Sequence, residues 1–111
     1  MNKIALVIDD NGDDLDTIST QLEIGLNYSV ETAKPSEIER YAGKKFDLVL
    51  IDGLNGECFE AYIQLNGGIK FIYSGDEKII EEAEKRKMKA FFKDRTLLDI
   101  LAELEAKDDT N

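Results

Sequence analysis

The sequence contains no histidine and only one cysteine, Cys58. The absence of histidine excludes Ser-His-Asp and Cys-His catalysis, histidine-containing metal sites and a role as a phosphohistidine carrier. A single cysteine excludes an internal disulfide and a zinc site built from cysteines, and we expect Cys58 to be a small buried thiol. Any chemistry in this chain must therefore use carboxylates, hydroxyls and lysine.

The sequence also has few positive charges and no long hydrophobic run. Its 24 acidic and 14 basic residues give a formal net charge of -10, which repels the phosphates of nucleic acids. No apolar run approaches the ~20 residues that cross a bilayer, and the apolar run near the start is too short for the core of a signal peptide. We expect a soluble cytoplasmic protein that binds neither nucleic acid nor membranes.

The length of 111 residues fits one domain with one hydrophobic core. No internal repeat, low-complexity segment or linker divides the chain. We expect the domain to cover residues 1–106 and residues 107–111 to form a polar C-terminal tail.

Short apolar runs alternate with stretches of helical periodicity. The strand-like runs are residues 3–8, 29–33, 46–51, 69–73 and 90–92. Apolar residues recur at helical spacing at Leu15, Ile18 and Leu22, at Ile79, Ile80 and Ala83, and at Leu97, Leu98, Leu101 and Leu104. Pro35 suits the first turn of another helix, whose inward face would hold Ile38, Tyr41 and Ala42. This alternation predicts an α/β fold, with a parallel sheet covered by helices on both faces.

Polar residues follow four of these predicted strands. Asp9 and Asp10 follow the first strand, Asp52 the third, Ser74 the fourth and Lys93 the fifth. The carboxyl ends of parallel strands meet at one edge of the sheet, so we expect these five side chains to converge. Three carboxylates held together require a bound proton or a cation, and Mg²⁺ is the hard, oxygen-binding ion that fits best. A nucleophilic carboxylate, a metal, a hydroxyl and a lysine are what phosphoryl transfer to an aspartate requires.

Four segments together resemble the signatures of bacterial two-component response-regulator receiver domains. They are Val-Ile-Asp-Asp-Asn at residues 7–11, Asp-Leu-Val-Leu-Ile-Asp at 47–52, Ile-Tyr-Ser-Gly at 72–75 and Phe-Phe-Lys at 91–93. The resemblance covers nearly the whole chain and implies the flavodoxin-like (CheY-like), doubly wound five-stranded sheet with strand order 2-1-3-4-5. Taken singly, each motif also has an ordinary structural interpretation, such as a turn, a helix cap or a surface lysine.

The resemblance implies a role for each of the polar residues that follow the predicted strands. Asp52 would be the phosphoacceptor, while Ser74 and Lys93 would each hold a phosphoryl oxygen. Asp10 would ligate Mg²⁺ directly and Asp9 through bound water. The implied magnesium ligands are thus Asp9, Asp10, Asp52 and the backbone carbonyl of Leu54.

Three features depart from the receiver pattern. Ser74 lies only 22 positions after Asp52, so the third helix must be short; we expect Phe59, Tyr62 and Ile63 on its buried side and residues 66–68 in a turn. Ala90 occupies the place where receivers commonly carry a switch aromatic, and Phe91 and Phe92 should lie on opposite faces of their strand. Asp94 replaces the usual proline after the lysine, and we expect it to cap the last helix.

Two functions remain open. The first is a single-domain receiver in a phosphorelay, phosphorylated on Asp52 by a histidine kinase or phosphotransfer protein and acting on an unknown output protein. It would be a phosphoacceptor rather than an enzyme, taking phosphate also from small donors and losing it to water. The alternative is a non-phosphorylated pseudo-receiver that serves as an interaction or dimerisation module. Basic residues at Lys85, Arg86, Lys87 and Lys89 are either favourable charges at a helix end or a docking patch for an acidic partner.

Overall fold

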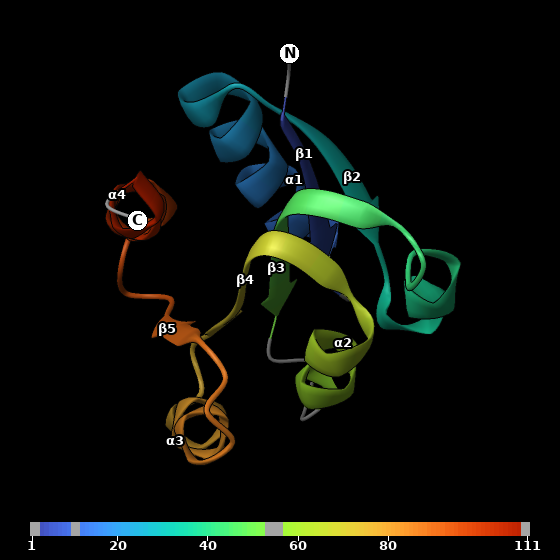
Figure 1. Cartoon of the computed structure of the whole chain (residues 1–111), viewed down its shortest axis with the longest axis vertical. Coiled ribbons are helices and arrows are strands. Elements are labelled where there is room, and N and C mark those ends of the chain that lie inside the picture. Colours follow the sequence, from blue (N-terminus) through green and yellow to red (C-terminus); the bar gives the residue numbers. More distant parts are fainter. Residues whose placement is uncertain (1–2, 10–11, 53–56, 110–111) are drawn as a thin grey trace.

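The computed structural model describes residues 3–9, 12–52 and 57–109, and the side chains of the same residues except 12–15 and 105–109. Five parallel strands form one sheet in the order β2-β1-β3-β4-β5 (Figure 1). The strands are β1 (Lys3–Ile8), β2 (Tyr28–Ala33), β3 (Lys45–Asp52), β4 (Asn66–Ser74) and β5 (Ala90–Phe92). The predicted fold class and strand order are confirmed.

Helices cover both faces of the sheet, as Figure 1 shows. On one face, α1 (Gly12–Thr20), a π-helical turn η1 (Gln21–Gly25) and α4 (Leu97–Asp109) contribute to a core cluster that includes Ile18, Leu22 and Leu101. On the other face, a 3-10 helix η2 (Pro35–Arg40), α2 (Cys58–Gln64) and α3 (Glu77–Lys85) contribute to a second cluster. The central strands are therefore buried on both sides, and residues 5–8 and 48–51 are fully inaccessible to solvent.

The second helical segment is a 3-10 helix and not an α-helix. Its start is held by the Lys34 N–H, which donates to the Glu37 carboxylate at 2.9 Å, and by the Glu37 N–H, which donates back to the Lys34 carbonyl at 2.9 Å. Ile38 is buried and Tyr41 packs against the same cluster, as predicted for the inward face. Leu22 of η1 is buried as predicted, whereas the side chain of Leu15 in α1 lies outside the described residues.

Helix α2 has only seven residues, which confirms the prediction of a short third helix. Cys58 and Ala61 are fully buried and Phe59 is nearly so, whereas Ile63 is 66% exposed. The prediction for Ile63 was wrong because Cys58, Phe59 and Ala61 occupy the inward face of this short helix. Lys70 donates from β4 to the carbonyls of Tyr62 and Leu65 at 2.6 and 3.1 Å, so a strand side chain satisfies the last carbonyls of α2.

Residues 66–68 belong to β4 and not to a turn, which corrects the sequence prediction. Leu65 already has extended backbone angles, so the chain passes from α2 into the strand without a turn of glycines. Asn66 and Gly67 pair with Lys45 and Phe46 of β3. A Cβ at Gly67 would lie 2.8 Å from Val49 Cγ2, so this glycine permits a close approach between neighbouring strands.

The final helix begins after Thr96, whose hydroxyl oxygen accepts from the Asp99 N–H at 3.2 Å. Thr96 is therefore the N-cap, and the assignment of that role to Asp94 was wrong. The backbone of residues 107–109, expected in the polar tail, continues α4. Among the described residues, no helix combines the length and apolar character needed to span a bilayer.

Candidate functional site

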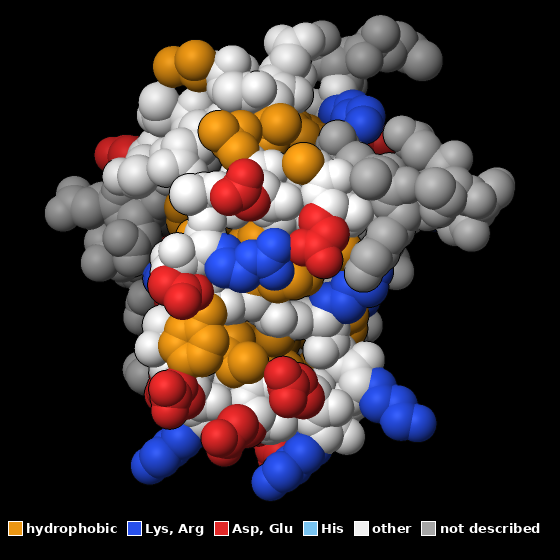
Figure 2. All heavy atoms as spheres, turned by 90° about the vertical axis from the view of Figure 1, so that its left-hand side faces the viewer, with side chains coloured by type: hydrophobic (Ala, Val, Ile, Leu, Met, Phe, Trp, Pro, Cys, Tyr) orange, Lys and Arg blue, Asp and Glu red, His pale blue; other side chains and the backbone are white. Residues whose placement is uncertain are grey.

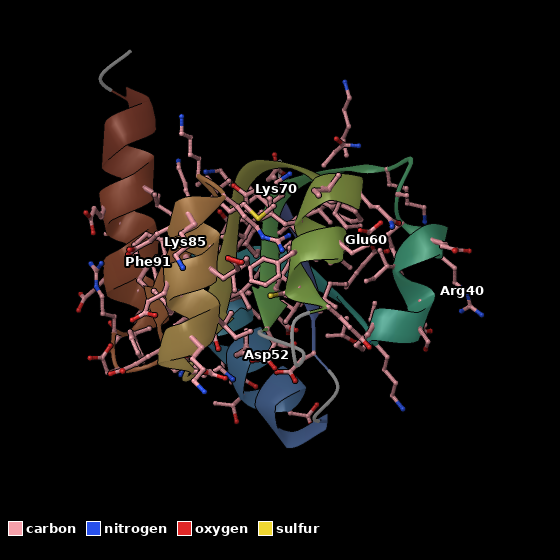
Figure 3. All side chains as sticks on the ribbon, turned by 90° about the horizontal axis from the view of Figure 1, so that it is seen from below. Arg40, Asp52, Glu60, Lys70, Lys85 and Phe91 are labelled. Atoms are coloured by element: carbon pink, nitrogen blue, oxygen red, sulfur yellow. The ribbon has the colours of Figure 1, made fainter. Side chains whose placement is uncertain are left out.

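Four of the predicted site residues meet at the carboxyl edge of the sheet. Ile8 of β1 pairs with Ile51, and Tyr73 of β4 pairs with Asp52, so Asp9 directly follows the partner of Ile51 and Ser74 directly follows the partner of Asp52. The Lys93 N–H donates to the Ser74 carbonyl at 3.0 Å, which places Lys93 beside the end of β4. Figure 3 shows Asp52 at this end of the sheet, far from Lys70. The parallel register thus gathers residues that are widely separated in the sequence.

Asp52 and Lys93 form an ion pair across β4. The Lys93 ammonium lies 2.6 Å from Asp52 Oδ1, and the two side chains are only 32% and 16% exposed. A short contact between charged partners that are largely shielded from water is stronger than an exposed salt bridge. The pair therefore fixes the ammonium of Lys93 at the carboxylate where reaction is predicted.

Asp9 and Ser74 are the two buried polar residues of this edge, at 0% and 4% exposure. The backbone N–H of Asp9 donates to the Ala33 carbonyl at 3.2 Å, which holds the end of β1 against β2. Ser74 Oγ accepts from the Asp76 N–H at 3.1 Å. That bond uses a lone pair of the hydroxyl and leaves its hydrogen able to donate to another acceptor.

The described residues supply part of the predicted magnesium site. Asp10 and Leu54 lie outside the described residues, and within the described part of the chain no three His, Cys, Asp or Glu residues form a cluster. Asp9 and Asp52 nevertheless provide carboxylates at the ends of adjacent strands, and Asp9 is fully buried. A buried carboxylate next to a second one fits a hard divalent cation with oxygen ligands. Asp9, Asp52, Asp10 and the backbone carbonyl of Leu54 would hold this cation.

Tyr73 is a site residue that sequence analysis missed. Its hydroxyl donates to the carbonyl of Arg95 at 2.7 Å and lies 3.5 Å from the carbonyl of Lys93. A cavity of about 160 Å³ beside it is lined by Tyr73, Lys93 and three residues of α1 and η1, Thr17, Ile18 and Gln21. The one signal in the sequence is a phenol group that directly precedes Ser74 and follows the apolar pair Phe71 and Ile72.

The side chains of β5 confirm the predicted alternation. Ala90 packs against the cluster under α2 and α3, whereas Phe91 packs against the opposite cluster under α1 and α4. The Phe91 ring meets Phe71 edge to face, with centroids 5.4 Å apart, and the guanidinium of Arg95 lies 5.2 Å from its centroid. Phe91 is thus held between a core ring and a surface cation.

The basic cluster at the end of α3 is partly structural. The guanidinium of Arg86 lies 4.3 Å from the centroid of Phe59 in α2 and 3.9 Å from the Glu82 carboxylate, so Arg86 joins α3 to α2. Lys85, Lys87 and Lys89 are exposed. On the face that carries α3, β5 and α4, Figure 2 shows small apolar patches with acidic and basic side chains between them. Charge of either sign is therefore available to a partner on this face.

The buried thiol of Cys58 has no nucleophilic character at neutral pH. Burial raises its pKa from 9.0 to about 11, and the negative charge of Asp52 adds a smaller contribution in the same direction. The expectation of a small buried thiol is confirmed, since Cys58 is fully inaccessible.

Three solved structures superpose on nearly the whole chain. A response regulator receiver domain protein (CheY-like) from Methanospirillum hungatei JF-1 has a TM-score of 0.68 and 23% sequence identity, covering 99% of this chain and 96% of its own. A CheY-like response regulator from Mesorhizobium loti has a TM-score of 0.69 and 13% identity, covering 95% and 98%. A structure described as adenylate cyclase from Rhodopirellula baltica has a TM-score of 0.69 and 21% identity, covering 96% and 87%. No protein-family model and no curated protein matches the sequence. The chain has the fold of CheY-like receiver domains.

Proposed function

We propose that this chain, with its CheY-like receiver fold, accepts a phosphoryl group on Asp52 in a Mg²⁺-dependent reaction and signals through contacts with other proteins. The contact of 2.6 Å between Lys93 and Asp52 carries the proposal. It joins a carboxylate nucleophile to a cation able to bind the incoming phosphoryl group, at the sheet edge where this fold class places its ligands.

The proposed step is an in-line displacement at phosphorus. A carboxylate oxygen of Asp52 attacks the phosphorus of a phosphohistidine or a small acyl phosphate, forming a P–O bond. The bond from phosphorus to the donor's nitrogen or oxygen breaks, and the leaving group keeps the electron pair; a leaving imidazole also takes up a proton. Hydrolysis later attaches a water oxygen to phosphorus and returns the Asp52 carboxylate.

Lys93 and Ser74 would stabilise the charge of the phosphoryl group. The Lys93 ammonium, already beside Asp52 Oδ1, would move its hydrogen bond to a phosphoryl oxygen as the carboxylate charge is lost. The Ser74 hydroxyl, which uses only a lone pair toward Asp76, would donate its hydrogen to another phosphoryl oxygen. Both donors are positioned before reaction, which lowers the cost of reorganisation.

Asp9 and Asp52 would hold the magnesium ion together with Asp10 and the carbonyl of Leu54. When bound, Mg²⁺ would neutralise charge on the phosphoryl oxygens and reduce the repulsion between donor and carboxylates. Asp9 would bring a buried carboxylate at the end of β1 to this site.

The donor must come from another protein or a small molecule, because the chain contains no histidine. A histidine kinase or phosphotransfer protein is the proposed donor, and a cytoplasmic location follows from that partnership. The output would be a change in affinity for a partner protein. The alternative, a pseudo-receiver that is never phosphorylated, is favoured by Ala90 at the usual switch position and by the seven-residue α2.

Phosphorylation by an acyl phosphate separates these functions. We expect acetyl phosphate with Mg²⁺ to add the mass of one phosphoryl group to the native protein, and EDTA to prevent the addition. Asp52→Asn should abolish it, because an amide is a poor nucleophile. Asp94→Asn, which removes an exposed carboxylate one residue from Lys93, is the matched control and should react like the native chain. A native protein that gains no mass would favour the pseudo-receiver.

A further inference from the structure

The hydroxyl of Tyr73 ties the loop after β5 to the strand that carries Ser74. Tyr73 is 8% exposed, and its hydroxyl donates to the Arg95 carbonyl at 2.7 Å while lying 3.5 Å from the Lys93 carbonyl. Both acceptors belong to the short segment 93–96 between β5 and α4. A side chain of β4 therefore holds the backbone on either side of Asp94.

Two attachments to neighbouring residues of β4 fix this segment. The first is the backbone bond from the Lys93 N–H to the Ser74 carbonyl at 3.0 Å. The second is the Tyr73 hydroxyl, two residues further along the segment at Arg95. A turn bond from the Arg95 N–H to the Phe92 carbonyl at 3.2 Å also shapes this segment, but it is the Tyr73 hydroxyl that ties Arg95 back to β4. The direction in which the Lys93 side chain leaves the backbone thus depends on Tyr73.

The ring of Tyr73 is itself fixed by the core. It belongs to the cluster under α1 and α4 and meets the ring of Phe71 edge to face, with centroids 6.4 Å apart. Burial raises the pKa of the Tyr73 phenol above its ordinary value, so the hydroxyl keeps its hydrogen at neutral pH and remains a donor. The donor is therefore placed by packing and available throughout the physiological range.

We propose that Tyr73 is a positioning residue for Lys93: its hydroxyl anchors the segment 93–95 so that the Lys93 ammonium meets Asp52. The proposal rests on the proposed phosphorylation of Asp52. The Tyr73 hydroxyl donates to the backbone of this segment and not to Asp52 or the phosphoryl group, so it acts only through the placement of the lysine. Small displacements of a charge-stabilising group reduce rate strongly, because alignment with the reacting oxygen is lost.

Tyr73→Phe tests this role by removing one oxygen and leaving the ring in the core. With saturating Mg²⁺ and a series of acetyl phosphate concentrations, we expect the maximal phosphorylation rate to fall about 3- to 10-fold, the range for one lost positioning hydrogen bond. The half-saturating donor concentration should change less than about 2-fold, because the cavity and the charges remain. Replacing Tyr73 with 4-aminophenylalanine, which restores a donor at the same place, should recover most of the rate.

Tyr41→Phe is the matched control, because Tyr41 is a partly buried tyrosine on the opposite face of the sheet. It should phosphorylate at the native rate. A Tyr73→Phe protein with native rate, a loss shared by Tyr41→Phe, or a failure of Tyr73→Phe to fold would each overturn the positioning role. If the native protein is not phosphorylated, the proposed function is wrong. The reaction of the native protein therefore distinguishes that outcome from a failure of the positioning role alone.

Discussion

The raised pKa of Cys58 predicts a specific loss of stability in alkaline solution. The thiol has an ordinary pKa of 9.0 and a pKa of about 11 in the folded protein, chiefly because it is buried in the core between α2 and the sheet. Folding therefore favours the protonated thiol. Its contribution to stability is complete below pH 9 and is lost as the pH rises from 9 toward 11.

The size of this loss follows from the two pKa values. Each pKa unit corresponds to about 1.4 kcal/mol, so the full contribution of the Cys58 thiol is on the order of 3 kcal/mol. At pH 10 the loss should already be on the order of 1 kcal/mol. Replacing Cys58 with alanine removes the titrating group and leaves a small cavity, which costs about 1–2 kcal/mol at any pH.

Urea unfolding of the native protein and of Cys58→Ala, followed by circular dichroism at pH 8 and pH 10, measures the effect. Tyrosines and lysines titrate alike in both proteins, so the difference in unfolding free energy isolates the thiol. We expect the native advantage at pH 8 to shrink by about 1 kcal/mol at pH 10. An advantage that is equal at both pH values would refute the reasoning.

Two further predictions concern the junction of α2 and β4. Lys70→Met should lower the free energy of unfolding by about 1–2 kcal/mol, because two carbonyls at the end of α2 lose their donor; a variant as stable as the native chain would contradict that role. Gly67→Ala should cost about 1–3 kcal/mol, because the added Cβ would lie 2.8 Å from Val49 Cγ2. Gly43→Ala is its control, since a Cβ there meets nothing within 4 Å, and equal losses in both variants would exclude the steric cause.

The sheet was predictable because its strands are the most distinctive segments of the sequence. Residues 5–8 and 48–51 are apolar on both sides of the strand, as burial on two faces requires, and each run is followed by aspartate. Once the strands are parallel, the convergence of Asp52 and Lys93 needs no further information. The predicted roles of Asp10 and Leu54 remain predictions, since neither residue is described.

The incorrect sequence predictions concern residues whose tertiary contacts override the secondary structure that their local sequence favours. Glycines at 67 and 68 have the composition of a turn, yet both belong to β4, which pairs with β3 from Asn66 onward. Asp94 is a good N-cap residue in isolation, but the bond of the Lys93 N–H to Ser74 holds the preceding backbone beside β4 and leaves the cap to Thr96. Such contacts depend on the neighbouring strand and have no local signature.

Tyr73 was missed for a related reason. Its place in an apolar strand predicts a core aromatic, and its ring does lie in the core. Its hydroxyl gains a role only because the segment after β5 returns beside the end of β4. This contact depends on how the ends of β4 and β5 meet in the folded protein, so the spacing of motifs in the sequence does not predict it.

The most direct test of the account is to locate the phosphoryl group by chemical trapping. After reaction with acetyl phosphate and Mg²⁺, borohydride reduces an aspartyl phosphate to homoserine, and peptide mass spectrometry reads its position. We predict homoserine at position 52, with residues 9 and 10 unchanged. Homoserine at another position, or none in a protein that folds natively, would contradict the assignment of Asp52 as the phosphoacceptor.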